Sequence, residues 1–153
     1  MKKLIFTTLL CVVWCVVNAQ DTGLLFTPSA FKGEVTQMIP SGYPAKQVQG
    51  NYSIQVLDGK VTVHMPYVGD VHTLAFDENG LNFTEECSGY RTKVKTKKKT
   101  NTTETEVIFR TRHAGVSYEF RVTLYNNNTF HINLSPSNAS ACNYAGRLVK
   151  MEK

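Results

Sequence analysis

Residues 51–69 read NYSIQVLDGKVTVHMPYVG, and this stretch predicts a tight β-hairpin. Asp58-Gly59 favours a type I′ turn, because both central residues of that turn need a positive φ angle. A two-residue loop fixes the register, and the alternation of apolar side chains gives the same register independently. The expected cross-strand pairs are Leu57 with Lys60, Val56 with Val61, Ile54 with Val63, and Tyr52 with Met65.

Further stretches alternate apolar and polar side chains with a period of two, and turn-forming residues separate them. No comparable pattern for an amphipathic helix follows residue 19. The sequence therefore predicts an all-β fold, either an antiparallel sandwich or a partly closed barrel of about seven to eight strands. Besides the two strands of the hairpin, the expected strands span residues 90–97, 104–112, 117–125, 130–134 and 141–149, and residues 34–39 and 81–84 are shorter strand candidates.

Residues 1–19 have the pattern of a cleaved signal peptide. Two lysines precede an apolar segment at residues 4–17, and Val17-Asn18-Ala19 fits a small-residue cleavage site. The apolar segment is short for a membrane span, although an uncleaved anchor helix is the alternative. We expect residues 20–153 to form a single exported β domain of unknown function, with no transmembrane segment after signal removal.

The expected location is the periplasm or the extracellular space. Lipidated cysteines follow a small residue, whereas Cys11 follows Leu10 and Cys15 follows Trp14, so we do not expect a lipoprotein. Without the two signal lysines the chain has 15 basic and 12 acidic residues, a net charge of +3. A charge this mild does not by itself indicate a nucleic-acid or membrane partner.

Two cysteines remain beyond the signal segment. In an exported protein Cys87 and Cys142 could form a disulfide, which would stabilise the fold by roughly 4 kcal/mol. Two separate, partly buried thiols are the alternative, because sequence gives no Cα–Cα distance. The histidines lack metal-ligand spacing, so we expect no metal and no cofactor. They are His64, His72, His113 and His131.

Several short motifs, taken in order, resemble one known family. They are DGKV at residues 58–61, MPYVG at 65–69, GLNF at 80–83, YEF at 118–120 and YAG at 144–146. The combination resembles the Bacteroidetes exported domain-of-unknown-function family 4251, whose hairpin ends in Leu-Pro-Tyr-Phe-Gly before Gly-Leu-Asn-Phe. Here Met65 and Val68 replace the family's Leu and Phe, and the charged segment before the first strand is short. The resemblance implies a mostly β fold in the bacterial cell envelope and implies no known activity.

A basic stripe runs along one face of the strand expected at residues 90–97. Lys93, Lys95 and Lys97 share that face with Arg91, and such a stripe could bind a polyanion. Alternatively, the lysines could simply discourage edge-to-edge aggregation. Glu104 opposite Lys97, and Glu106 opposite Lys95, would neutralise part of the stripe. No aromatic residue lies within the basic run at residues 91–99, so we do not expect nucleic acid as a partner.

The other candidate site is the corner after the hairpin. Tyr67 has an apolar ring and a polar tip, so it could line a small pocket with Asn82. The alternative is a purely structural corner, since Pro66 ends the ladder and Gly69 and Gly80 allow tight turns.

These features indicate a non-catalytic binding or interaction module whose partner is an envelope protein, a glycan or another polyanion. A small hydrolase that gathers carboxylates across strands is the alternative from a different class. The two differ in what a structure must contain, since an enzyme needs convergent titratable groups in a concave pocket.

Overall fold

The computed structural model describes residues 25–67, 80–97 and 100–151. These residues form ten β-strands and no helix, and they include no apolar helix of the length that a bilayer crossing needs. The strands are β1 (Phe31–Pro40), β2 (Lys46–Gln47), β3 (Ser53–Leu57), β4 (Lys60–Met65), β5 (Leu81–Glu86), β6 (Ser88–Lys97), β7 (Thr102–His113), β8 (Val116–Tyr125), β9 (Thr129–Pro136) and β10 (Cys142–Val149).

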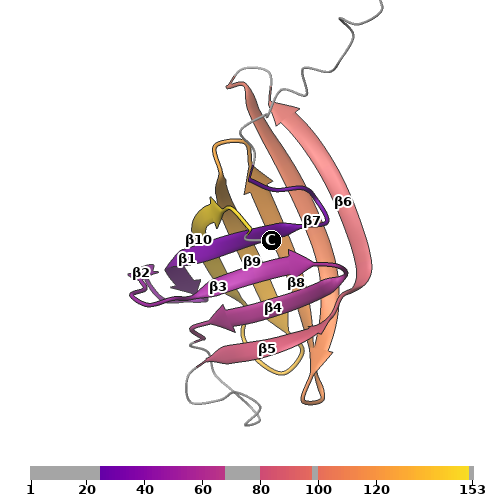
Figure 1. Cartoon of the computed structure of the whole chain (residues 1–153). Helices are drawn as coiled ribbons and strands as arrows, with labels where there is room; N and C mark the ends of the chain where they lie inside the picture. The colour runs from indigo at the N-terminus through magenta and orange to yellow at the C-terminus, as the bar shows by residue number, and fades with distance from the viewer. Residues whose placement is uncertain (1–24, 68–79, 98–99, 152–153) are drawn as a thin grey trace, which may run out of the picture.

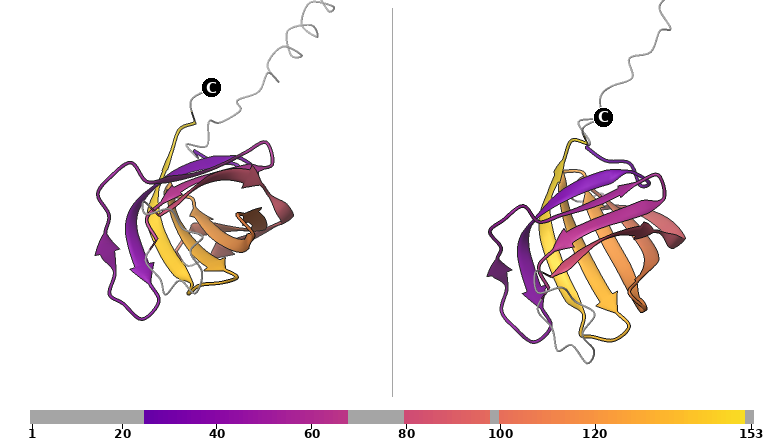
Figure 2. Two further views of the ribbon diagram at one scale, coloured as in Figure 1. Left: turned by 90° about the horizontal axis from the view of Figure 1, so that it is seen from below. Right: turned by 60° about the horizontal axis from the view of Figure 1, so that its bottom comes forward.

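All ten strands belong to one antiparallel sheet that curls into a half-barrel (Figures 1 and 2). The strand order is β5-β4-β3-β1-β10-β9-β8-β7-β6, and the short β2 pairs with β1 off this path. The prediction of an all-β, partly closed architecture is confirmed. The strand count is higher than expected because the short β2 was not anticipated. In addition, residues 31–40 form a strand longer than the pattern indicated.

The organising hairpin has the predicted register. Asp58 and Gly59 have φ angles of 51° and 74°, as a type I′ turn requires. Leu57 pairs with Lys60, Val56 with Val61, and Ile54 with Val63, as expected. The described ladder begins at Ser53 and His64, one position short of the expected Tyr52–Met65 pair, and Pro66 follows the end of β4.

The basic hairpin has a different register from the one expected. Lys95 lies opposite Glu104 and Lys93 opposite Glu106, so the pairing is displaced by two residues. β7 begins at Thr102, two residues earlier than expected, and Asn101 before it adopts a left-handed φ of 49°, which Asn tolerates better than most residues. The expected ion pairs still form, but between residues that are diagonal neighbours in the ladder. Lys97 Nζ lies 2.5 Å from the Glu104 carboxylate, and Lys95 Nζ lies 3.9 Å from the Glu106 carboxylate.

The chain joins the two edges of the sheet at Cys87. β5 pairs with β4 and β6 pairs with β7, so the link between β5 and β6 crosses from one edge strand to the other. The Cys87 amide donates a hydrogen bond to the carbonyl of Gly59 at the hairpin turn, at 2.7 Å. In the described residues β5 and β7 approach each other without forming a backbone ladder, and we call the line between them the seam. Side chains span it: the carboxylate of Glu85 contacts the imidazole of His113, and the ring of Phe83 stacks on the same imidazole.

Apolar side chains fill the concave face of the half-barrel. One connected cluster of buried residues draws on every strand except β2 and β6. The interior is therefore a packed core, and ligand sites must be sought on the outer face and along the seam. Its largest fully buried members include Phe31, Ile54, Met65, Phe109, Tyr118, Phe120, Leu124, Ile132, Leu134 and Tyr144.

The two cysteines are free thiols, so the disulfide considered from the sequence is absent. Cys142 is buried in β10, where it lies opposite Leu134 on one side and Pro40 on the other. Cys87 is half-buried at the junction of β5 and β6, against the edge of the core. Cys87 thus lies between two edge strands, neither of which neighbours β10 in the sheet.

We expect both thiols of the folded protein to react slowly with an alkylating reagent. Burial raises the pKa of Cys87 from 9.0 to about 11, and burial also raises the pKa of Cys142. At pH 8 the thiolate fraction of Cys87 should therefore be about a hundredfold lower than that of an exposed thiol. Iodoacetamide labelling followed by mass spectrometry measures this, with the urea-unfolded protein as the fast control; equal rates in both states would contradict it.

Candidate functional site

The structure brings the two residues predicted at the corner into one cavity on the outer surface. Tyr67 and Asn82 line a cavity of about 640 Å³ together with Tyr52 and His64. We call these four residues the tyrosine shelf. The remaining lining residues are Gly50, Asn51, Pro66 and Gly80.

Strand alternation positions the polar groups of the tyrosine shelf. His64 in β4 and Asn82 in β5 are directly paired, and each lies between residues that are buried. Both side chains consequently point away from the core. The ring of Tyr52 stacks on the His64 imidazole, with centroids 5.4 Å apart and an interplanar angle of 27°. An aromatic surface thus lies beside an exposed amide.

Hydrogen bonds to backbone carbonyls fix the corner that carries Tyr67. The Tyr144 hydroxyl donates to the carbonyl of Pro66 at 2.8 Å, and the Tyr67 hydroxyl donates to the carbonyl of Ser140. Burial raises the pKa of Tyr144, so its hydroxyl remains a donor at any physiological pH. The corner can therefore have a structural role and line a pocket at the same time.

Gly80 is required where β5 leaves the corner. Its φ angle is +97°, and a Cβ atom there would overlap the carbonyl oxygen of Met65. The backbone of Gly80 can thus approach the end of β4 as a larger residue could not. Gly69, the other glycine predicted at this corner, lies outside the described residues.

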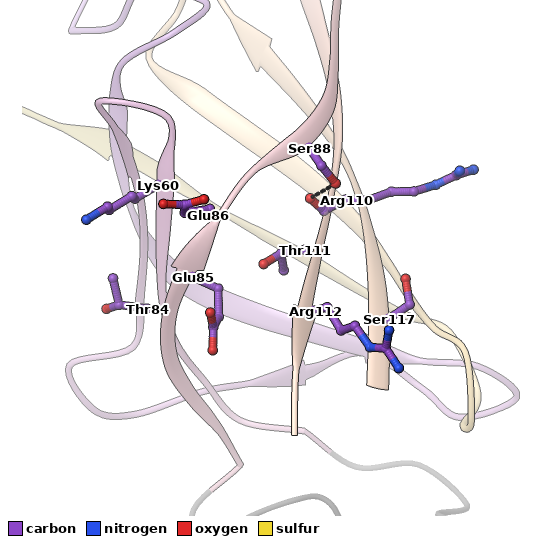
Figure 3. Close-up of a pocket in the computed structure, with 9 residues that line it drawn as sticks. All are labelled: Lys60, Thr84, Glu85, Glu86, Ser88, Arg110, Thr111, Arg112 and Ser117. Atoms are coloured by element: carbon purple, nitrogen blue, oxygen red, sulfur yellow. Dashed lines mark hydrogen bonds between the residues drawn. The ribbon is translucent and has the colours of Figure 1, made fainter. Parts of the chain in front are cut away.

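A second cavity, of about 650 Å³, opens along the seam between β5 and β7 (Figure 3). Glu85 projects into the space between the strands, whereas Lys60 and Arg110 extend away from it. Glu85 Oε1 lies 2.9 Å from His113 Nδ1, and Phe83 stacks on the imidazole with centroids 4.8 Å apart. The complete lining comprises Lys60, Thr84, Glu85, Glu86, Ser88, Arg110, Thr111, Arg112 and Ser117.

Glu85 and Glu86 both line the seam cavity, but their side chains extend in different directions (Figure 3). Glu85 is half-buried beside His113, whereas its neighbour Glu86 is exposed and pairs across the ladder with Lys60. No group of three or more acidic, histidine or cysteine residues within the described ranges could hold a metal ion. The facing carboxylates that a glycosidase-type mechanism uses are therefore not assembled in this cavity.

The predicted lysine stripe lies on the outer face of the β6–β7 hairpin. Lys95 and Lys97 are neutralised by Glu106 and Glu104, as described above. Lys93 is exposed and lies opposite Glu106 in the ladder. Most of the stripe is thus a set of solvated ion pairs, each of which contributes little to stability.

The sequence did not identify Tyr52 and His64 as members of the tyrosine shelf. The hairpin register contains the signal, because it places His64 opposite Ser53, beside Tyr52. The seam cavity had no comparable signal, since it depends on how β5 and β7 approach each other across the half-barrel.

The fold and cavities define an all-β half-barrel domain with a packed interior and polar sites on its outer surface. Residues 20–148 match the sequence model described as "Domain of unknown function (DUF4251)", so the chain belongs to this family. The match confirms the family that the combined motifs indicated. No curated protein matches the chain.

Proposed function

We propose that this chain is a non-catalytic binding module that takes a neutral saccharide unit on the tyrosine shelf. The observation that carries the proposal is the cavity of about 640 Å³ in which the rings of Tyr52, His64 and Tyr67 lie beside the amide of Asn82. A pyranose ring has C–H groups on its faces and hydroxyl groups around its edge. Aromatic rings pack against such faces, and an amide both donates hydrogen bonds to hydroxyls and accepts them.

The rigidity of the corner supports this proposal. Pro66 and Tyr67 are held by Tyr144 and Ser140, so the ligand does not need to order them on binding. Ordering of side chains on binding costs affinity, and a preformed site avoids that cost. The stacking of Tyr52 on His64 likewise fixes one wall before the ligand arrives.

The N-terminal pattern supports a place for this module outside the cytoplasm. A positive start, a short apolar segment and a small-residue site at Ala19 are the features of an export signal. Export would bring the tyrosine shelf to the glycans of the cell envelope, which makes an envelope glycan the proposed partner.

Titration with soluble neutral disaccharides tests the proposal. We expect saturable chemical-shift changes at Tyr52, His64 and Asn82 in the ¹H–¹⁵N spectrum, and recovery of the unchanged sugar after incubation. Asn82→Ala removes the exposed amide without touching the core, and we expect it to weaken binding about tenfold, the effect of one lost hydrogen bond plus an unpaired sugar hydroxyl.

The matched control is Thr62→Ala, which removes a polar group from the same outer face of β4. Thr62 bonds Thr84 at 3.0 Å and is not part of the tyrosine shelf, so its loss should leave affinity unchanged. Shifts that map elsewhere, or equal affinities for the Asn82→Ala variant and the parent, would rule out this site. Cleavage of the sugar would instead support the alternative function, a small hydrolase.

A further inference from the structure

Three arginines and one glutamate meet on the outer face of β6, β7 and β8, on strands that do not contribute to the tyrosine shelf. Arg91 pairs with Ile108, and Ile108 pairs with Arg121 on its other side. In the next row Arg110 pairs with Glu119. We call Arg91, Arg110, Arg121 and Glu119 the arginine cluster.

A β-bulge in β6 directs Arg91 toward this cluster. Ser88 pairs with Arg110 and Arg91 pairs with Ile108, so Gly89 and Tyr90 together oppose a single residue of β7. Gly89 has a φ of +61°, the left-handed conformation that such bulges favour. Because of the extra residue, Tyr90 turns inward to stack on Phe109, and Arg91 faces outward. Bulges commonly re-aim a side chain near a functional site.

Glu119 orders part of the cluster without neutralising it. Its Oε2 accepts hydrogen bonds from Nε and Nη2 of Arg110, at 2.8 and 2.7 Å. These bonds lower the pKa of Glu119, so the carboxylate remains ionised at neutral pH. Arg121 Nη2 lies 3.6 Å from the other oxygen. Three guanidinium groups against one carboxylate leave two positive charges in excess.

Arg91 makes no ion pair or side-chain hydrogen bond with any residue in the described part of the chain. It lines a cavity of about 200 Å³ with Arg110, Arg121 and Glu119, and Gly89 and Ile108 complete the walls. Since Arg91 and Arg121 are two strands apart, their backbones are separated by about 10 Å. The planar fork of each guanidinium matches a carboxylate or sulfate group.

We propose that the arginine cluster is an anion site that binds the carboxylate or sulfate groups of an anionic polysaccharide. The flat face of paired strands suits an extended polymer, and Lys93 continues the positive charge along β6. Elements that lie in a membrane interface insert apolar side chains beside their basic ones. In the described ranges the exposed large apolar residues are Tyr43, Leu57, Tyr90 and Val94, and none of them lines this cavity.

Binding at the arginine cluster can be distinguished from binding along the lysine stripe by two double variants that each remove two positive charges. Arg91→Gln with Arg121→Gln removes two charges from the cluster, whereas Lys95→Gln with Lys97→Gln removes two charges from the neighbouring ion pairs on the same face. All four side chains are on the outer surface, so both double variants should fold, which circular dichroism verifies.

Binding of a size-defined heparin oligosaccharide to the full chain is the measurement. We expect the arginine double variant to lose at least about tenfold in affinity and the lysine double variant less than about threefold. Equal losses would show that binding follows total charge and would overturn the site. An unchanged affinity in the arginine variant, or no binding by the parent protein, would also overturn it.

Vesicles that contain phosphatidylglycerol form the second arm of the experiment. The proposal expects the parent protein to bind the oligosaccharide and not the vesicles. Stronger retention on vesicles than on heparin would assign the cluster to a lipid surface and would contradict the proposal. Saccharide binding at the tyrosine shelf should survive in the arginine variant, so a failure of one site is distinguishable from a failure of the other.

Discussion

Gly146→Ala is expected to destabilise the protein by about 3 kcal/mol or more, because the new methyl group has no space. A Cβ atom at this position in β10 would overlap the carbonyl oxygen of Glu34 and would lie 2.8 Å from the ring of Phe130. The carbonyl belongs to the backbone of β1, so no side-chain rotation can relieve the overlap. The pairing of β1 with β10 would have to separate or shift locally.

The surroundings of Gly146 explain why this position is so restricted. β1 contains a bulge between Val35 and Gln37, directly where it pairs with Gly146. A Cβ atom on Gly33 would also overlap the Phe130 ring. The ring of Phe130 therefore packs directly over two glycines in adjacent strands, and the core depends on the absence of side chains at both.

Urea unfolding measures the effect, with Gly42→Ala as the matched control. Gly42 has a φ of +77° and no atom near the position of a Cβ, so its replacement costs only backbone strain, about 1 kcal/mol. Gly146 has no such positive φ, so its cost reflects the overlap alone. Equal destabilisation by the two substitutions would show that β1 moves away without significant cost.

The local parts of the fold were predictable because their signals lie within a few residues. Asp58-Gly59 determines both the turn and the register, and the alternating side chains of β3 and β4 agree with it. The strand at residues 117–125 was equally clear, and β8 spans Val116–Tyr125. In both cases the turn chemistry and the period of two independently specify the same structure.

The remaining features depend on contacts that a period of two does not encode. The loop before Thr102 has no sharp turn signal, so the register predicted for the basic hairpin differs by two residues from the observed one. No strand was expected at residues 85–89, whereas Cys87 connects the two edges of the sheet and Gly89 lies in a bulge. Whether a sheet curls into a half-barrel or folds into a sandwich depends on such bends.

The candidate sites show the same division. Tyr67 and Asn82 were predicted together because each belongs to a short motif at the corner after the hairpin, and the structure places both in one cavity. The arginine cluster was not predicted, since Arg91, Arg110 and Arg121 come from three strands whose registers must all be known. The bulge at Gly89, which sets the outward direction of Arg91, has no reliable sequence signature.

Phe109→Ala is expected to destabilise the protein by about 3–5 kcal/mol, the range for removal of a buried aromatic ring. Phe109 is fully buried at the centre of three parallel rings. It stacks on Phe120 with centroids 5.0 Å apart at 11°, and on Tyr90 with centroids 5.7 Å apart at 12°. The substitution removes both stacking interactions as well as the apolar area of the ring.

The loss of Phe109 should also release the bulged part of β6. Tyr90 is partly exposed; its ring stacks on Phe109, and its hydroxyl donates a hydrogen bond to the carbonyl of Pro28. Without the ring beneath it, Tyr90 should no longer hold the bulge. Amide hydrogen exchange should therefore accelerate in Ser88–Lys97 more than in the hairpin of β3 and β4, which belongs to the other end of the strand order.

Val94→Ala is the matched control, because Val94 lies in the same edge strand with 59 % of its surface exposed. It should change the free energy of unfolding by less than about 0.5 kcal/mol and leave exchange in β6 unaltered. Phe109→Leu should recover part of the lost stability, since it restores apolar volume without the stacking. If Phe109→Ala cost no more than Val94→Ala, the column of rings would not be what attaches β6 to the core.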